Sequence, residues 1–364
     1  MPATTQRDPG ETKAALRSWL GARLVDVRDV SIGSLQTPPA NGFSSETILF
    51  DASWVGPGGP VRDHRLVARV APSGHTVFLE PDFVCQCRVL EVLATRSEVP
   101  VPGVVGVEED PAYLGAPFVV MEHVDGLVPT DNPPYAMGGW LAEATPEQQR
   151  RLWWSGLEAM AGIHTLDWRR LGLEVVAGAR SGRPGLEHQL AYYDDFLRWA
   201  GGGSANPVVD ATAAWLSDNR PPEEGPLVLL WGDSRIGNMI FDDFRCAAVL
   251  DWEMTGLGQP EADLGWWLYF DRQLTEALGL PRPAGFPGRE ETVERYGQLV
   301  GHELAHLDYY EVFAGYRFAV ILVRLASLLQ ESDILPIDST FATDNLATQL
   351  LVRMLDLPDL GQPG

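Results

Sequence analysis

The chain has 364 residues, 45% of them hydrophobic, and a formal net charge of −23 at pH 7. This length and apolar content indicate one large or two medium globular domains and exclude a disordered chain. The acidic charge argues against a nucleic-acid partner, because a phosphate backbone requires clustered Lys and Arg side chains.

We expect neither a targeting segment nor a membrane segment. The first twenty residues have no basic start and no apolar stretch, so they do not resemble a signal peptide. The run FAVILVRLASLL falls short of the roughly 20 residues that span a bilayer, and it contains Arg324. The cysteines, Cys85, Cys87 and Cys246, are too few for a disulfide framework and poorly spaced for a zinc site. These features predict a protein of the reducing cytoplasm with no membrane partner.

The first third of the chain has the pattern of a small mixed domain of strands and helices. Runs of branched and alternating apolar residues, separated by turns such as GPGGP, indicate strands. Apolar residues at helical spacing indicate helices. The predicted helices cover residues 11–24 and 81–96, and the predicted strands cover 25–32, 46–54, 65–70, 103–108 and 117–122.

Helical patterns dominate the rest of the chain. The turn-rich stretch HVDGLVPTDNPPYAMGG predicts a domain boundary at its start, which we place between residues 123 and 124. Beyond it, the one clear β signal lies in residues 227–252. Helices are predicted at 147–167, 186–200, 208–218, 263–278 and 289–313, and in the tail from residue 340. Together the two regions predict an α+β protein.

The stretch LVLLWGDSRIGNMIF, residues 227–241, places charged side chains between two apolar runs. Because burying an unpaired charge costs several kcal/mol, Asp233 and Arg235 need partners or a function. An Asp that stabilises a tight Gly-containing turn is one explanation. A second apolar strand ends at Asp251, however. Asp233, Asn238 and Asp251 together supply what phosphoryl transfer requires, which is one carboxylate beside the attacking hydroxyl and two oxygen ligands for Mg²⁺.

These two stretches resemble motifs of the aminoglycoside phosphotransferase family, a branch of the protein-kinase-like fold. The family's His-Gly-Asp-x-x-x-x-Asn is similar to WGDSRIGN here, and its Ile-Asp-Trp-Glu is similar to VLDWE, which GLGQPEADLGWWL follows. Upstream, NGFSSETILFDA resembles the phosphate-covering loop and LVARVAPSG the strand with the phosphate-contacting cation. The resemblance runs from Gly33 to Leu268. The loop and strand are most similar to the metabolite branch associated with acyl-CoA dehydrogenases.

The resemblance implies a two-lobed protein-kinase-like fold. A small N-terminal antiparallel β-sheet lobe, residues 1–123, would bind the nucleotide, and a larger, mainly helical lobe, residues 124–364, would carry catalysis and the acceptor. The implied activity is transfer of the γ-phosphate of ATP, with Mg²⁺, to a hydroxyl of a small molecule by a monomer or homodimer. Two alternatives stay open: a kinase of a hydroxyacyl-type metabolite, and an ATP-binding pseudokinase module.

The resemblance also implies roles for residues of the second lobe. Asp233 corresponds to the catalytic base, and Asn238 and Asp251 correspond to the Mg²⁺ ligands. Arg235 lies where several kinase-like enzymes keep a basic residue that meets the transferred phosphate. The alternative for Arg235 is a surface ion pair with Asp242 or Asp243.

In the first lobe, the implied nucleotide contacts come from a loop, a strand, a helix and the hinge. Backbone groups of Glu122, His123 and Val124 would hold the adenine, and Ser44 and Ser45 would cover the phosphates. Lys13 is the chain's only lysine and precedes the first strand. The resemblance then implies Arg69 as the phosphate-binding cation on the strand, with Gln86 at the helix position where kinases place its glutamate partner. Arg69 keeps the charge and can grip phosphate bidentately.

The chain departs from the family pattern in three places, one of which is Arg69 where kinases place a lysine. Trp231 replaces the family's His, so any hydrogen bond of that imidazole is either replaced by the indole N–H or lost. Gln86 cannot form an ion pair with Arg69, and Glu80 or Glu91 could substitute from neighbouring turns.

Structural roles account for several other conspicuous residues. We expect Asp263 to be a buried carboxylate that caps a helix and braces the catalytic loop, and His164 to be a satisfied core histidine. For Glu253, a metal role and a structural role are equally open. The cluster of Trp266, Trp267, Tyr269 and Phe270 is interpreted as core, and His302 with His306 as solvated or capping residues.

Overall fold

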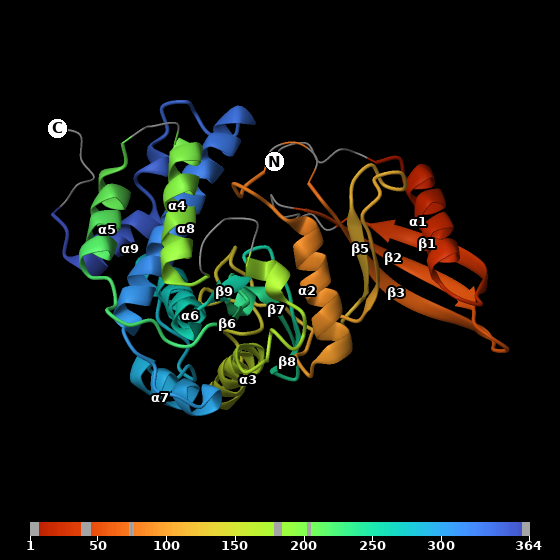
Figure 1. The fold of residues 1–364 in the computed structure, drawn as a ribbon, viewed down its shortest axis with the longest axis horizontal. Helices are drawn as coiled ribbons and strands as arrows, with labels where there is room; N and C mark the ends of the chain where they lie inside the picture. Colours follow the sequence, from red (N-terminus) through yellow and green to blue (C-terminus); the bar gives the residue numbers. More distant parts are fainter. Residues whose placement is uncertain are drawn as a thin grey trace. The chain divides into compact units, whose positions relative to one another are not determined.

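The computed structural model describes residues 7–37, 45–72, 74, 76–177, 184–201 and 205–358. The chain forms two compact units (Figure 1). Unit 1 comprises residues 1–96 and 101–124, and unit 2 comprises residues 97–100 and 125–364.

Unit 1 is built on a five-stranded antiparallel sheet with the strand order β1-β2-β3-β5-β4. Branched and aromatic residues favour these strands. Helix α1 begins at Pro9 behind the N-cap Asp8, whose side chain accepts the N–H of Glu11. The elements are α1 (Pro9–Arg23), β1 (Arg28–Gln36), β2 (Glu46–Val55), β3 (Val61–Val70), α2 (Phe83–Arg96), β4 (Val104–Glu108) and β5 (Phe118–Glu122).

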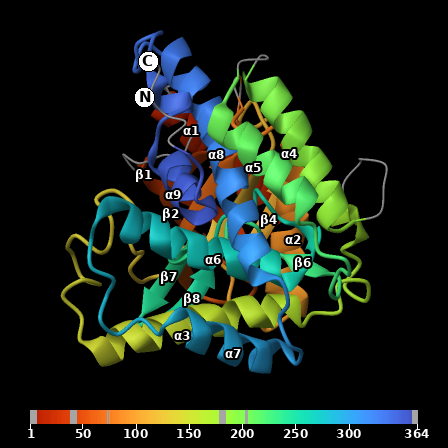
Figure 2. The same cartoon turned by 90° about the vertical axis from the view of Figure 1, so that its left-hand side faces the viewer.

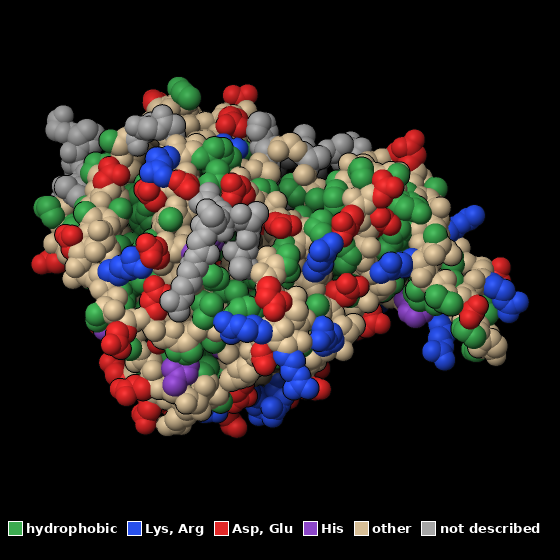
Figure 3. Space-filling view, viewed as in Figure 1, with side chains coloured by type: hydrophobic (Ala, Val, Ile, Leu, Met, Phe, Trp, Pro, Cys, Tyr) green, Lys and Arg blue, Asp and Glu red, His purple; other side chains and the backbone are tan. Residues whose placement is uncertain are grey.

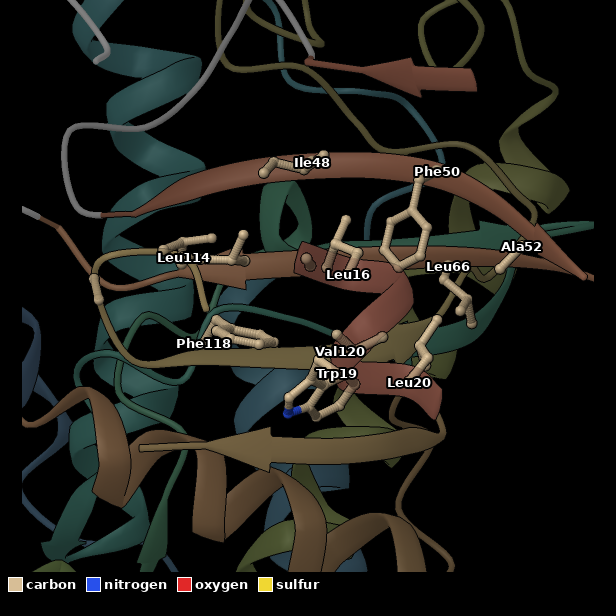
Figure 4. Close-up of a cluster of buried hydrophobic side chains, with 13 residues drawn as sticks. Leu16, Trp19, Leu20, Ile48, Phe50, Ala52, Leu66, Leu114, Phe118 and Val120 are labelled. Atoms are coloured by element: carbon tan, nitrogen blue, oxygen red, sulfur yellow. The ribbon is translucent and has the colours of Figure 1, made fainter. Parts of the chain in front are cut away.

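The core of unit 1 lies on one face of this sheet (Figure 4). Alternate residues of β3, Leu66, Ala68 and Val70, are buried there with Leu16 and Trp19 of α1. Because successive strand residues point to opposite faces, the residues between them lie on the other face. The sheet therefore has one face sealed by α1 and a second face that carries other side chains.

Unit 2 is mainly helical, with two short two-stranded antiparallel sheets, β6 with β9 and the hairpin of β7 with β8. Helix α3 begins at a capping box in which Thr145 and Gln148 bond reciprocally. The elements are α3 (Pro146–His164), η1 (Glu174–Ala177), α4 (Leu186–Gly201), α5 (Pro207–Asp218), β6 (Val228–Leu230), η2 (Ile236–Asn238), β7 (Met239–Asp242), β8 (Arg245–Val249), β9 (Gly256–Gly258), α6 (Pro260–Leu274), η3 (Glu276–Leu278), α7 (Arg289–Val300), α8 (Leu307–Glu331), η4 (Thr340–Ala342) and α9 (Leu346–Leu355). A small antiparallel sheet unit and a larger helical unit confirm the predicted α+β class.

Helix α8 is the central helix of unit 2, with α4, α5, α6 and α9 packed around it (Figures 1 and 2). Its 25 residues include an 18-residue window with a mean hydropathy of 1.8, so by length and composition alone it could cross a membrane. Of that window, 67% is buried inside the structure. The helix is longer than the apolar run FAVILVRLASLL suggested, and its burial indicates a core helix of a folded domain.

The single helix predicted over residues 289–313 is wrong. Helix α7 ends at Gly301, whose φ is +80°, and α8 begins after His306, whose φ is +56°. Both are left-handed conformations that interrupt a helix. His302 and His306 therefore do not share a helical face.

The thiols and the acidic surface match the composition. Cys85 and Cys87 are buried and free, and burial raises the pKa of the Cys87 thiol to about 12, so the thiol is a core group and not a nucleophile. Asp and Glu side chains are spread over the face of each unit seen in Figure 3. This spread is typical of a solvated acidic surface.

Candidate active site

The candidate residues fall into two groups, one in each unit. In unit 2 the candidate catalytic loop runs from Trp231 to Asn238, between β6 and β7. Gly232 has a φ of +98°, and a Cβ atom there would collide with the backbone carbonyl of Met254. Only glycine fits this position. The close approach holds the loop against the turn that follows Asp251.

Three side chains donate hydrogen bonds to the carboxylate of Asp233, which is 12% exposed. Trp266 Nε1 lies 2.8 Å from Oδ1, and Asn238 Nδ2 lies 2.6 Å from Oδ2. Arg235 Nε lies 3.0 Å and 3.2 Å from the two oxygens. These donors hold the carboxylate in one orientation, as a general base must be held to meet a substrate proton.

The β7–β8 hairpin brings Asn238 and Asp251 together. Met239 pairs with Val249, and the N–H of Leu250 donates to the carbonyl of Asn238 over 2.8 Å. The next residue is Asp251, whose φ of +57° is a left-handed conformation that Asp tolerates. Two residues that are 13 positions apart in sequence thus meet at one end of a hairpin.

The donor set at this end fits Mg²⁺. Asn238 turns its amide nitrogen toward the carbonyl and the carboxylate of Asp233, which leaves its Oδ1 directed elsewhere. Mg²⁺ usually takes one or two carboxylates and completes its shell with substrate phosphates and water. Among the described residues no group of three or more His, Cys, Asp or Glu side chains could hold a metal ion. Asn238 and Asp251 offer one amide oxygen and one carboxylate, a set that suits an ion whose other ligands are phosphate and water oxygens.

Asp263 braces the catalytic loop from α6. Its fully buried carboxylate accepts the N–H of Trp231 over 2.7 Å and of Gly232 over 3.0 Å. His164 Nε2 lies 3.0 Å from the same carboxylate, and its Nδ1 lies 2.7 Å from the Tyr296 hydroxyl. The expectation of a satisfied core histidine is confirmed. Asp263 does brace the loop, but no side chain caps α6, so the predicted cap is wrong.

Trp231, which stands in place of the family's His, is fully buried. Its indole N–H donates to the carbonyl of Leu250 over 2.7 Å, immediately before Asp251. The indole thus ties the catalytic loop to the strand that presents Asp251.

Arg235 lies between two carboxylates, Asp233 and Asp131, and donates to both. Burial opposes its charge, but the two carboxylates outweigh burial and raise the pKa of Arg235. The predicted alternative, a surface pair with Asp242 or Asp243, is wrong. Asp131 precedes the loop by about a hundred residues, so sequence proximity could not indicate this partner.

The aromatic cluster is core, and it also makes two contacts with the candidate catalytic loop. Trp266 is 1% exposed, yet its N–H bonds Asp233. The guanidinium of Arg235 lies 5.4 Å from the Phe270 ring, within cation–π range. A signal was available, because Trp266 follows Asp263 by three positions on α6, and residues at that spacing share a helical face.

In unit 1 the candidate nucleotide contacts lie on the sheet face opposite the core. In the register of the sheet, Leu49 pairs with Val67 and Val67 pairs with Met121, so the three side chains form one row. Leu49 and Val67 are only half-buried. A small cavity beside this row, of about 50 Å³, is lined by Ser34, Gln36, Leu49, Phe50, Asp51, Arg65, Leu66 and His123. This face offers an apolar surface of the kind on which a nucleotide base packs.

Arg69 lies on the same face of β3, two residues after Val67. Its Nε and Nη2 donate to the Ser45 hydroxyl over 3.1 Å and 2.7 Å. The positive charge of Arg69 reduces the burial-raised pKa of the Cys87 thiol on α2, so Arg69 lies near that helix. Gln86, the neighbour of Cys87, is half-buried. Ser44 lies outside the described residues.

The hinge segment uses two of its three backbone N–H groups within unit 1. The N–H of Glu122 donates to Gly103 over 2.7 Å, and the N–H of His123 donates to Arg65 over 2.9 Å. These two donors are already engaged in the sheet. The backbone N–H of Val124 and the carbonyl groups are the hinge atoms that suit an adenine edge.

Comparison with known proteins places the chain in a family context. The model of the phosphotransferase enzyme family matches residues 36–295. Acyl-CoA dehydrogenase family member 11 of Gallus gallus is 33% identical over 200 residues, which cover 53% of this chain and 24% of that protein. The chain spans about a quarter of the length of the first curated relatives that it matches.

Solved structures share the fold over nearly the whole chain. A candidate aminoglycoside phosphotransferase from Ralstonia eutropha has a TM-score of 0.68 and 24% identity, covering 94% of this chain and 95% of its own. A thermostable mutant of aminoglycoside phosphotransferase APH(4)-Ia, in complex with AMP-PNP and hygromycin B, has a TM-score of 0.55 and 15% identity, covering 94% of this chain and 100% of its own. These likenesses confirm the predicted kinase-like fold class.

Proposed function

The chain belongs to the phosphotransferase enzyme family, and on this premise we propose that it is an ATP-dependent kinase of a small-molecule hydroxyl. One observation carries the proposal. The carboxylate of Asp233 is held by three donors, one of which is Asn238, and the hairpin places Asn238 beside Asp251. A fixed base next to two oxygen ligands is the arrangement that phosphoryl transfer needs.

Nucleotide binding is assigned to the exposed sheet face of unit 1. The adenine would pack on Leu49 and Val67 and bond the backbone of Val124, and Arg69 with Ser45 would meet the phosphates. The solved relative that binds AMP-PNP shares the fold, which supports ATP as the donor. Asn238 and Asp251 would hold Mg²⁺, which supplies charge neutralisation at the phosphates when it is bound.

In the transfer step, the acceptor hydroxyl attacks the γ-phosphorus while the bond to the ADP oxygen breaks. Asp233 takes the hydroxyl proton, since it is the carboxylate of the loop that its neighbours hold in place. Arg235 already lies against Asp233 and donates to it. Its charge is therefore available to the transferred phosphate without a long movement of the side chain.

A hydroxyacyl-type metabolite is the second candidate acceptor. The similarity to a protein named as an acyl-CoA dehydrogenase family member supports it. The pseudokinase alternative rested on Trp231 and Gln86. The indole of Trp231 makes a hydrogen bond that ties the loop to the Asp251 strand, and Asp233, Asn238 and Asp251 are all present, so an active enzyme is the better-supported proposal.

The test is transfer of radiolabelled γ-phosphate from Mg·ATP to a panel of aminoglycosides, macrolides, sugars, choline-like alcohols and hydroxyacyl thioesters. We expect one class to be labelled by the wild-type protein and not by Asp233→Asn, which keeps the side-chain shape. Labelling by both proteins would remove Asp233 from the mechanism. A protein that binds the nucleotide but neither labels an acceptor nor hydrolyses ATP would favour the pseudokinase alternative.

A further inference from the structure

A buried arginine, Arg317 of α8, lies behind the candidate catalytic loop of unit 2. It is 3% exposed. Its Nη2 donates to the carbonyl of Gly232 over 3.2 Å, and its guanidinium lies 4.5 Å from the centre of the Trp266 ring. Gly232 is the residue before Asp233, and Trp266 donates its indole N–H to Asp233. Arg317 thus contacts both Gly232, which precedes the candidate base Asp233, and Trp266, which donates a hydrogen bond to Asp233.

The surroundings of Arg317 are unusual for a buried charge. Within the part of the chain that the structure describes, no carboxylate lies within ion-pair distance of it, and its Nε and Nη1 meet no hydrogen-bond acceptor. The rings of Tyr193 and Phe313, at 5.3 Å and 5.6 Å, lie around the guanidinium with Trp266. Burying an ion without a counter-charge costs several kcal/mol, and three rings and one carbonyl compensate only part of that.

Stability therefore gives a poor account of Arg317, because a hydrophobic side chain of similar volume often serves a core as well or better. Its electrostatic effect on Trp266 gives a better account. A cation over the face of an indole withdraws electron density from the ring and makes the N–H a stronger donor. That N–H is the one that bonds Asp233 Oδ1.

We propose that Arg317 is a positioning residue for the base Asp233. It stacks on Trp266 and holds the Gly232 carbonyl, and so it keeps the indole N–H on Oδ1 and the carboxylate turned toward the acceptor. The proposal rests on the proposed function in treating Asp233 as the base. The contact chain from Arg317 through Trp266 to Asp233 is a structural statement that can be measured without any acceptor.

The first readout is the indole N–H signal of Trp266 in two-dimensional ¹H–¹⁵N spectra, identified among the 12 tryptophans by its loss in Trp266→Phe. In Arg317→Met we expect this signal to shift upfield and its exchange with solvent to speed up. The control is Arg324→Met on the same helix, which removes a guanidinium 4.5 Å from the ring of Trp199. The control should leave the Trp266 signal where it is.

The second readout is turnover with Mg·ATP, using the acceptor from the panel or, without one, slow ATP hydrolysis. General-base catalysis contributes about 10²–10⁴-fold, so we expect Arg317→Met to lower kcat by roughly 10–100-fold. The KM for ATP should stay near the wild-type value, and the melting temperature should not fall below that of the wild type. Arg317→Lys should restore part of kcat. In the Trp266→Phe background, Arg317→Met should lower kcat by a smaller factor than it does in the wild-type protein. The two residues act through one contact, so their effects should not add.

Either of two results overturns the proposal: an unchanged Trp266 signal in Arg317→Met, or a shifted signal with unchanged kcat. Should Arg317→Met fail to fold, Arg317→Lys is read instead, since a lysine cannot both stack on the ring and reach the carbonyl. A wild-type protein that transfers no phosphate and hydrolyses no ATP would overturn the proposed function. The Trp266 indole N–H signal in Arg317→Met would then test the contact from Arg317 through Trp266 to Asp233 without any measurement of activity.

Discussion

The sheet of unit 1 and the catalytic loop of unit 2 hold their candidate functional groups in different ways. In the sheet, the backbone ladder sets the direction of Val67 and Arg69, and the opposite face buries Leu66 and Ala68 under α1. In the loop, side chains from distant elements hold the polar groups. Asp233, for example, accepts bonds from its own loop and from α6.

This difference has a physical consequence. A side chain on the half-exposed sheet face can be replaced without disturbing the ladder, so the change should alter ligand affinity and little else. A side chain in the loop shares its partners with others, so replacing it should disturb several residues at once, and the effects should not add.

The largest expected effect is on the loop. Asp233→Ala should lower phosphoryl transfer by about 10²–10⁴-fold, the usual contribution of a general base, because Asp233 takes the hydroxyl proton in the proposed mechanism. Mg·ATP affinity should stay near wild type. Steady-state kinetics and calorimetric titration measure the two quantities, and Asp242→Ala, an exposed position at the end of β7, is the matched control. Wild-type turnover in Asp233→Ala would refute the assignment.

The second prediction concerns Asp251, the candidate Mg²⁺ ligand at the end of the β7–β8 hairpin. Asp251→Asn keeps a residue that tolerates the left-handed backbone, so only the charge changes. We expect Mg·ATP affinity to fall by more than the roughly 10–100-fold that loss of an outer-shell partner of a metal costs, and affinity for metal-free ATP to change little. Titration with Mg²⁺ and with EDTA separates the two. Equal Mg·ATP affinity in both proteins would make Asp251 a structural carboxylate.

On the sheet face, Arg69→Ala should weaken Mg·ATP binding by roughly 1.5–3 kcal/mol, the range for hydrogen bonds to charged groups. Arg69→Lys should recover only part, because a point charge lacks the planar fork of the guanidinium. Thermal unfolding should be nearly unchanged, as expected for a position held by the ladder. Arg62→Ala, exposed at the start of the same strand, is the control. Unaltered ATP affinity in Arg69→Ala would show that another cation holds the phosphates.

The smallest expected effect is on stability, from a solvent-exposed ion pair outside both candidate groups. Glu276 accepts a hydrogen bond from Arg272 over 2.8 Å, and that bond lowers the pKa of Glu276. Because its folded pKa is depressed, its contribution is present above the unfolded pKa and is lost as pH falls through the folded one. Solvent screens this half-exposed pair, so Glu276→Gln should cost about 0.3–0.5 kcal/mol at pH 7. Denaturant unfolding at pH 7 and pH 3 checks this, and an equal cost at both would contradict it.

Much of the fold was predictable because it depends on local periodicity. Branched runs predicted the strands that contain Glu46 and Arg69, and helical spacing predicted α2 and α4. The spacing within WGDSRIGN and VLDWE led to Asp233, Asn238 and Asp251, since a hairpin of fixed register brings together residues on either side of its turn. The roles of these residues stay predictions.

The amino-acid sequence by itself determined the family, the α+β class and the candidate base with its metal ligands, because those depend on neighbours along the chain. Only the tertiary structure decided what surrounds them. Asp131 reaches Arg235 across about a hundred residues, Trp266 reaches Asp233 from α6, and Arg317 reaches Gly232 from α8. Each contact joins segments that are far apart in the sequence, so no local pattern indicates it. From the sequence alone, a buried aromatic residue or arginine is indistinguishable from an ordinary core residue, because only packing shows which polar atom it contacts.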